Sequence, residues 1–170
     1  MTWTLDRINA ADRTEFVTAF GGVFEHSPWV AERAWSQRPF ISLDALHEGM
    51  RAIVDAASRD EQLALIRAHP TLAGKAAIRG ELTEASTREQ KGAGLDQCSP
   101  AEFAKLTSLN DAYEATFGFP FIIAVRGHTR ASIISAMAQR LDNDAPDEHD
   151  EALRQIARIA RFRLADMITA

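Results

Sequence analysis

Residues 42–57 have the sequence SLDALHEGMRAIVDAA. The apolar side chains of this segment recur at spacings of three and four residues, which is the period of an α-helix that turns one face to a core. Ser42 stands immediately before the first of them and is a favoured N-cap residue. We therefore predict an amphipathic helix whose apolar stripe consists of Leu43, Leu46, Met50, Ile53, Val54 and Ala57.

The composition of the whole chain also favours helices. Among the 170 residues, alanine occurs 30 times, whereas valine occurs five times and tyrosine once. Alanine is the strongest helix former, and β-branched and aromatic residues are enriched in strands. We predict an all-α protein with one domain over residues 1–170, built as a single helical bundle of about seven or eight helices with short connections.

Start and stop signals place further helices along the chain. Ser58-x-x-Glu61 has the pattern of a capping box, and the helix that it opens should end near His69 because Pro70 disfavours a helical conformation of the preceding residue. Ser99-Pro100-x-Glu102 combines an N-cap, a proline at the first helical position and a glutamate at the third. Other helices are predicted at residues 16–20, after Ser27-Pro28, after Thr129, and after an acidic turn at residues 142–149.

Two helix starts fit the sequence that follows a loop at residues 71–81, one at Thr83 and one at Ser86. Ser86-x-x-Glu89 is a second candidate capping box. In that case the carboxylate of Glu89 would accept a hydrogen bond from a backbone amide in the first turn of the helix, which is a common structural role of glutamate.

Residues 117–127, FGFPFIIAVRG, break the helical pattern. Their apolar side chains are contiguous, and Gly118 and Pro120 forbid a regular helix, so we predict a buried non-helical connector. The backbone amides and carbonyls of such a segment have no helix to satisfy them. The connector is therefore either a hydrophobic plug or a backbone surface that reads a small heterocyclic or ureido group.

Charge and sequence content exclude several classes of protein. The chain has 24 acidic and 19 basic residues, a net charge of −5 and no dense Lys/Arg run, so a nucleic-acid partner is not expected. No run of about 18 apolar residues predicts a membrane span. Cys98 is the single cysteine, which suits a reducing compartment, and Ile168-Thr169-Ala170 is not a peroxisomal tripeptide, so we expect a cytoplasmic protein.

Two polar residues stand on helix faces that should be apolar. His69 follows Leu65 and Ile66 by four and three residues, where a histidine serves either as a core or capping residue or as a functional group. Arg163 lies on the inward stripe of the last helix, whereas helical phase turns Arg154, Arg158 and Arg161 to solvent. A buried guanidinium cannot lose its charge, so Arg163 needs a carboxylate or an anionic ligand as its partner.

The sequence resembles a known family at several of these positions. The resemblance rests on ALIRAHPTLAG at residues 64–74, Ser86-x-x-Glu89-Gln90, FGFPFIIAVRG and the terminal Arg163-Leu164. Together they are similar to 2-oxo-4-hydroxy-4-carboxy-5-ureidoimidazoline (OHCU) decarboxylase, over nearly the whole chain. The resemblance implies an all-α, cofactor-free homodimer that decarboxylates OHCU to (S)-allantoin, after urate oxidase and hydroxyisourate hydrolase have acted.

The resemblance also implies a set of site residues. His69 matches the catalytic histidine of the family and Glu89 matches its acidic partner, and no metal ligand is expected. Arg161 is a rival for the role of the terminal arginine, but helical phase favours Arg163. The positions that match substrate contacts are Pro70, Ser86, Gln90, Phe121, Ile122, Ile123, Ala124, Val125 and Arg163.

This assignment implies a mechanism that needs no prosthetic group. Loss of carbon dioxide beside a carbonyl and an imine-like nitrogen leaves electrons that the substrate ring itself delocalises. The enzyme then has to orient the carboxylate, stabilise an enolate-like charge and deliver one proton to one face. His69 at a helix C-terminus and near a carboxylate is a suitable general acid, while Glu89 would grip the substrate hydroxyl and orient the imidazole.

Two other classes of function remain open on the sequence. A metal-dependent hydrolase could use His69, Glu89 and His128, although their spacing matches no known ligand motif. A catalytically silent helical binding module is the second. Purified protein that contains stoichiometric metal would favour the first, and protein that fails to accelerate allantoin formation would favour the second.

Overall fold

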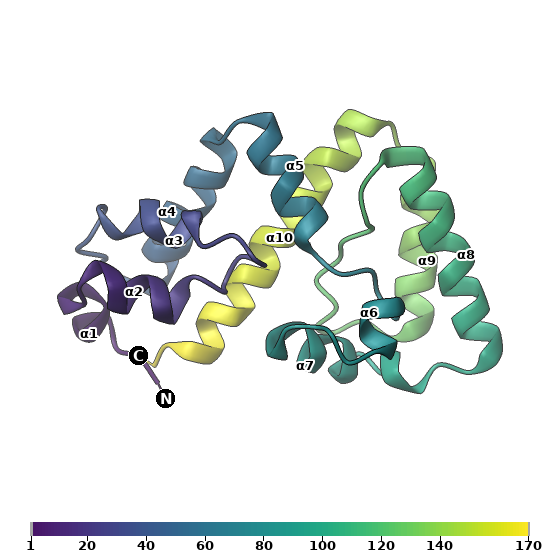
Figure 1. The fold of residues 1–170 in the computed structure, drawn as a ribbon, viewed down its shortest axis with the longest axis horizontal. Helices are drawn as coiled ribbons and strands as arrows, with labels where there is room; N and C mark the ends of the chain where they lie inside the picture. The colour runs from purple at the N-terminus through teal and green to yellow at the C-terminus, as the bar shows by residue number, and fades with distance from the viewer. Residues whose placement is uncertain (1, 170) are drawn as a thin grey trace. The chain divides into compact units, whose positions relative to one another are not determined.

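The computed structural model describes residues 2–169, with the backbone alone at Lys75 and Ala76, so the terminal Ala170 lies outside the described residues. The described chain is all-α, as predicted, and eight of its helices have seven residues or more. In chain order (Figure 1) the elements are α1 (Leu5–Ala10), α2 (Arg13–Phe20), α3 (Trp29–Trp35), α4 (Leu43–Ala56), α5 (Arg59–Ala68), α6 (Lys75–Ile78), α7 (Glu84–Gly92), the 3₁₀ turn η1 (Leu95–Gln97), α8 (Pro100–Phe117), α9 (Arg130–Arg140) and α10 (Ala145–Met167).

Side-chain caps begin these helices where the sequence predicts them. Ser42 accepts a hydrogen bond from the Ala45 amide at the start of α4, 2.9 Å away. Ser58 and Glu61 form the predicted capping box of α5, and Ser99 forms that of α8. Each such cap contributes about 1 kcal/mol to helix stability, so they define the boundaries of the helices as well as supporting them.

The last helix begins earlier than predicted. The sequence predicts an acidic turn over residues 142–149, but α10 already starts at Ala145. The carboxylate of Asp144 accepts a hydrogen bond from the Asp147 amide at 3.1 Å, which is the contact an N-cap makes. Acidic residues in a first turn favour the helix because they face the positive end of its dipole. The acidic run is therefore a helix start.

The contacts divide the described chain into two compact units. The terminal unit consists of residues 2–68 and 156–169, and the central unit of His69–Gln155. Helix α10 contributes its first part to the central unit and the rest to the terminal unit. The prediction of a single domain stays a prediction.

The terminal unit packs α2 against α3 and α3 against α4. The two ends of the described chain meet in this unit (Figure 1), where the Trp3 amide donates to the Met167 carbonyl and the Thr169 amide donates to the Trp3 carbonyl, both at 2.8 Å. The rings of Trp3, Phe16 and Phe20 pack together beside this bridge. The apolar stripe of α4 is buried at Leu46, Met50 and Val54, as its spacing predicts.

The central unit packs α8 against α9. Residues 118–129 join these two helices without any helical turn, so the predicted connector is confirmed. Gly118 ends α8 with a φ of 78°, a left-handed conformation that glycine adopts without strain. Among the described residues, no helix is both long enough and apolar enough to cross a membrane.

Candidate functional site

The segment that begins at His69, after the end of α5, is held by hydrogen bonds from two helices of the central unit. Because α5 ends at Ala68, His69 directly follows its C-terminus, as predicted, and its side chain is buried. The Ala73 amide donates to Oε1 of Gln90 on α7 at 2.9 Å. The Leu72 carbonyl accepts from Nδ2 of Asn110 on α8 at 3.0 Å. These two bonds fix the loop that begins at His69.

Helix α7 carries three of the predicted site residues at i, i+3 and i+4, the spacing that places side chains on one face. Ser86 and Gln90 are buried, and Glu89 is partly exposed. The second candidate capping box is wrong, because Thr83 is the N-cap and its hydroxyl accepts from the Ser86 amide at 3.2 Å. Glu89 therefore lies in the body of the helix, where its carboxylate does not serve the first turn.

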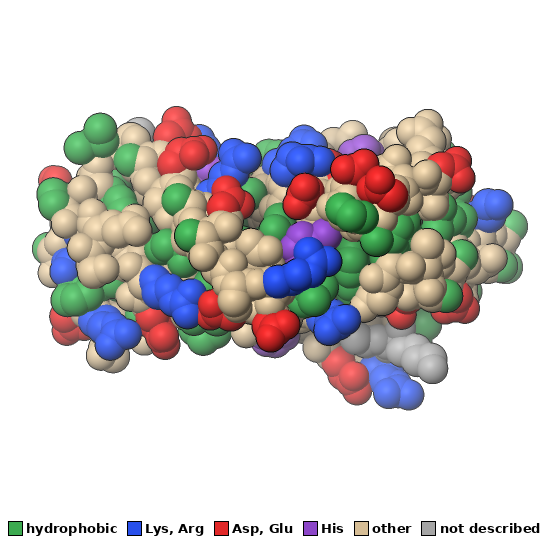
Figure 2. All heavy atoms as spheres, turned by 90° about the horizontal axis from the view of Figure 1, so that it is seen from above, with side chains coloured by type: hydrophobic (Ala, Val, Ile, Leu, Met, Phe, Trp, Pro, Cys, Tyr) green, Lys and Arg blue, Asp and Glu red, His purple; other side chains and the backbone are tan. Residues whose placement is uncertain are grey.

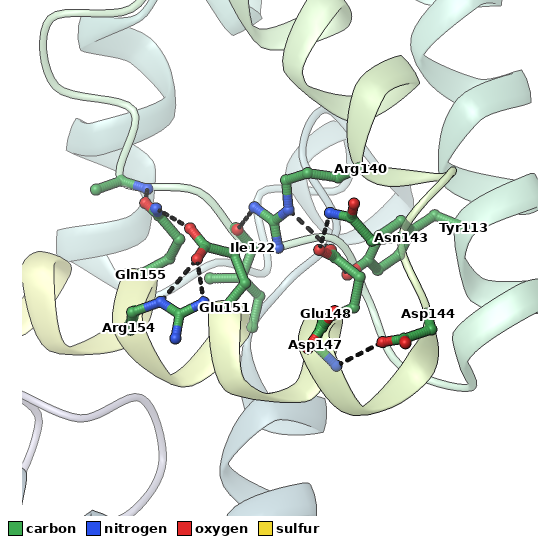
Figure 3. Close-up of polar contacts among 11 residues, drawn as sticks. Tyr113, Ile122, Arg140, Asn143, Asp144, Asp147, Glu148, Glu151, Arg154 and Gln155 are labelled. Atoms are coloured by element: carbon green, nitrogen blue, oxygen red, sulfur yellow. Dashed lines mark hydrogen bonds and ion pairs between the residues drawn. The ribbon is translucent and has the colours of Figure 1, made fainter.

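A cluster of polar side chains surrounds the buried Glu148 and reaches the connector through Arg140 (Figure 3). Glu148 is fully buried and accepts hydrogen bonds from Tyr113 Oη at 2.6 Å, Arg140 Nε at 2.8 Å and Asn143 Nδ2 at 3.0 Å. The guanidinium of Arg140 also lies over the ring of Phe121, 4.4 Å from its centroid. A buried carboxylate with one cation and three donors is well compensated.

The same cluster reaches the connector. Nη1 of Arg140 donates to the Ile122 carbonyl at 2.6 Å, and the Ala124 amide donates to Oε1 of Gln155 on α10 at 2.9 Å. The side chains of all five predicted contact residues, 121–125, are buried. Side chains thus satisfy two backbone groups that the sequence left without partners. Arg140 was detectable from the sequence, since it follows Ile133 and Met137 by seven and three residues on the inward stripe of α9.

Tyr113 provides a spectroscopic test of the cluster because it is the only tyrosine of the chain. Burial and the hydrogen bond to Glu148 raise the pKa of Tyr113 above its ordinary value of 10.0. Its neutral phenol is thus favoured in the folded state. We expect the contribution of Tyr113 to the free energy of unfolding to be fully present below about pH 10. It should be lost as the pH rises further, because the unfolded chain releases this proton at a lower pH than the folded chain does.

Absorbance at 295 nm during an alkaline titration measures this directly. The tyrosinate signal should develop only at a pH clearly above 10, together with unfolding, whereas denatured protein should titrate near 10. Tyr113→Phe should have a flatter stability profile at alkaline pH. Titration of the folded protein at the pH found for the denatured chain would contradict the buried cluster.

A pocket of about 580 Å³ lies on the central unit beside α7. Leu82, Leu95 and Phe103 contribute apolar walls, and Cys98 lines it as well. Burial, assisted by the nearby charge of Glu102, raises the pKa of the Cys98 thiol, so it remains protonated at neutral pH. Of the predicted site residues that the structure describes, Gln90 alone lines this pocket.

Arg163 belongs to the terminal unit, and the structure gives it a carboxylate partner. Its Nη2 donates to Oε2 of Glu25 at 2.8 Å, and its Nη1 donates to the carbonyls of Gly22 and Val23 at 3.2 and 3.4 Å. Both Arg163 and Glu25 are buried. The predicted inward phase of Arg163 is confirmed. The sequence did not reveal Glu25, because the partner comes from a distant loop rather than from the same helix.

The other arginines of α10 lie on its outer side, as their phase predicts. Arg154 and Arg158 are exposed. Arg161 is partly exposed and forms a surface ion pair with Asp44 at 2.9 Å. Surface ion pairs contribute little to stability, whereas a buried pair that loses one partner leaves an uncompensated charge.

These two environments predict different effects of the same substitution. Arg163→Lys keeps the charge but cannot reproduce the fork that reaches Glu25 and two carbonyls, so it should lower the free energy of unfolding by about 1–3 kcal/mol. Arg161→Lys should change it by less than about 0.5 kcal/mol. Urea unfolding of both variants measures the difference. Equal losses would show that the Glu25 pair does not stabilise the fold.

The alternative site around His128 does not assemble a metal-binding group. Nδ1 of His128 lies 2.9 Å from Oγ of Ser132 at the start of α9. Over residues 2–169, apart from the undescribed side chains, no group of three His, Cys, Asp or Glu residues is arranged to hold a metal ion.

Figure 2 shows basic and acidic side chains interspersed on the face it presents, in keeping with the absence of a dense Lys/Arg run.

Comparisons with known proteins agree on one family. The family model for OHCU decarboxylase matches residues 9–165. A relative from Haloferax volcanii, named 2-oxo-4-hydroxy-4-carboxy-5-ureidoimidazoline decarboxylase, is 44% identical over 98% of this chain and 97% of its own length. A crystal structure of (S)-allantoin synthase has a TM-score of 0.77 and 30% identity, covering 98% of this chain and 54% of that one.

A second solved structure shares the fold. It is an OHCU decarboxylase crystallised in the presence of (S)-allantoin, with a TM-score of 0.71 and 22% identity. The alignment covers 92% of this chain and 97% of that one. Both units of the described chain therefore belong to a known all-α architecture.

Proposed function

The chain belongs to the OHCU decarboxylase family, and we propose that His69 and Glu89 carry out its reaction. Its activity is that of a carboxy-lyase, which decarboxylates OHCU to (S)-allantoin in urate degradation. The observation that carries the proposal is the bond between the Ala73 amide and Gln90, since it ties the loop that begins at His69 to the helix that bears Glu89.

The decarboxylation requires one proton donor and one group that holds the substrate. When the bond to the carboxylate breaks, carbon dioxide leaves and its electron pair passes into the ring as an enolate-like charge. His69 delivers a proton to one face of the ring, which makes the product optically active. Glu89 holds the substrate hydroxyl and orients the imidazole. The buried position of His69 keeps water from competing for that face.

Polar groups around these two residues supply the binding site in this proposal. Ser86 and Gln90 lie on the same helix as Glu89, and Pro70 follows His69. The connector at residues 121–125 supplies backbone donors and acceptors for the ureido group. The pairing of Arg163 with an anionic oxygen of the substrate stays a prediction from the family resemblance. The homodimer also stays a prediction.

A stereochemical assay on freshly generated substrate tests the proposal. His69→Asn and Glu89→Gln should each lower the rate of (S)-allantoin formation by at least ~100-fold, because each removes a positioned acid–base group. Both variants should keep the melting temperature of the wild type within a few degrees. Circular dichroism of the product measures its optical purity, and chelator-treated protein should remain active.

His128→Asn is the matched control, since it changes another histidine of the central unit and should keep full activity. Loss of activity in this variant, or restoration of activity by an added metal, would favour the hydrolase alternative. Residual activity of His69→Asn together with a large loss of melting temperature would make His69 a structural residue. A racemic product at the uncatalysed rate would support the silent binding module.

A further inference from the structure

Two side chains form hydrogen bonds with the backbone of the connector. Arg140 on α9 donates to the carbonyl of Ile122, and Gln155 on α10 accepts from the amide of Ala124, at 2.6 and 2.9 Å (Figure 3). We propose that Arg140 and Gln155 are positioning residues for the substrate, which act by holding this backbone in place. The inference rests on the proposed function, in which residues 121–125 contact the ligand.

The geometry of the backbone explains how these two hydrogen bonds affect ligand binding. From residue 120 to residue 125 the chain makes neither a turn nor a bend. The two side-chain bonds fall on Ile122 and Ala124, which are two residues apart, and this is the spacing at which an extended chain repeats the side to which its peptide groups point. Ile122 and Ala124 therefore share the side that faces Arg140 and Gln155, and Ile123 directs its amide and carbonyl to the other side.

The opposite side of the connector is the one that can read a ligand. The backbone of Ile123 makes no hydrogen bond with any residue that the structure describes, although its side chain is buried. The same is true of the backbone of Phe121. A row of donors and acceptors in this arrangement can pair with a planar amide-like group, as an exposed strand edge pairs with a peptide. A ureido group has the matching donors and a matching acceptor.

Each gripping side chain is itself held in one orientation. Gln155 donates through Nε2 to Oε1 of Glu151 at 2.8 Å, and a carboxylate can only accept, so the Gln155 carbonyl must face Ala124. Burial raises the pKa of Glu151, but hydrogen bonds from Gln155 and Arg154 outweigh it, so the pKa is lowered and Glu151 stays ionised at neutral pH. Arg140 is fixed by Glu148, as described above.

The test compares binding with stability. In Arg140→Lys a single ammonium replaces the fork that reaches both Glu148 and Ile122, and in Gln155→Met the acceptor for Ala124 is lost. Each variant should raise the Kd for (S)-allantoin and the KM for OHCU roughly tenfold, which is the effect of one lost positioning bond. Because the acid–base groups remain in place, kcat should stay within about threefold.

Two matched controls separate positioning from a structural role. Tyr113→Phe removes a hydrogen bond to the same Glu148, and the hydroxyl that is lost makes no hydrogen bond with the backbone of the connector. Arg154→Met removes a partner of the same Glu151. Both should leave Kd and KM within twofold of the wild type, although Tyr113→Phe should lower the melting temperature.

The inference is overturned if Arg140→Lys and Gln155→Met lose melting temperature but bind (S)-allantoin with wild-type affinity. It is also overturned if Tyr113→Phe raises KM as much as Arg140→Lys does. Should Arg140→Lys fail to fold, Gln155→Met alone decides, because its contact with the connector is a single hydrogen bond. Failure of the proposed function gives a different result, in which His69→Asn keeps stereospecific activity.

Discussion

The structure of the central unit depends on how one buried, non-helical segment satisfies its backbone. Residues 118–128 cannot form a helix because of Gly118 and Pro120, yet their apolar side chains are buried. Buried amides and carbonyls without partners are costly, so other elements must supply donors and acceptors. Arg140 and Gln155 do so at Ile122 and Ala124. This requirement places polar groups on the inner faces of α9 and α10, where a simple bundle would have apolar ones.

That requirement also connects the fold with its chemistry. A helix uses up its backbone hydrogen bonds internally, so an all-α protein has few peptide groups with which to recognise a planar, polar ligand. A straight segment held from one side leaves the other side available. The loop after α5 follows the same principle, because side chains of α7 and α8 hold its backbone at Ala73 and Leu72. In both places long side chains position short stretches of irregular chain.

Local signals in the sequence predicted the helices well and distant pairings poorly. Ser42, Ser58 and Ser99 were recognised as caps because capping involves residues only three positions apart. Two local predictions of helix starts were wrong, because a residue upstream of the predicted start supplies the cap. Thr83 precedes Ser86 by three residues and takes its role, and Asp144 starts α10 inside the expected turn.

Helical phase identified Arg163 as buried, but neither phase nor spacing could find Glu25, which lies 138 residues away in the chain. The cluster of Tyr113, Arg140 and Glu148 was missed in the same way, since its members come from three helices. The site residues themselves were inferred from resemblance to a family. What the structure adds is the set of contacts that hold their backbone.

The most direct test of this account follows the backbone amide of Ile123 by nuclear magnetic resonance while (S)-allantoin is added. The account predicts a large, saturable shift of the Ile123 amide with the affinity measured by calorimetry, and a much smaller shift of the Ala124 amide, which is already bonded to Gln155. If (S)-allantoin binds with that affinity and the Ile123 amide does not move, the connector does not read the ligand and the account is wrong.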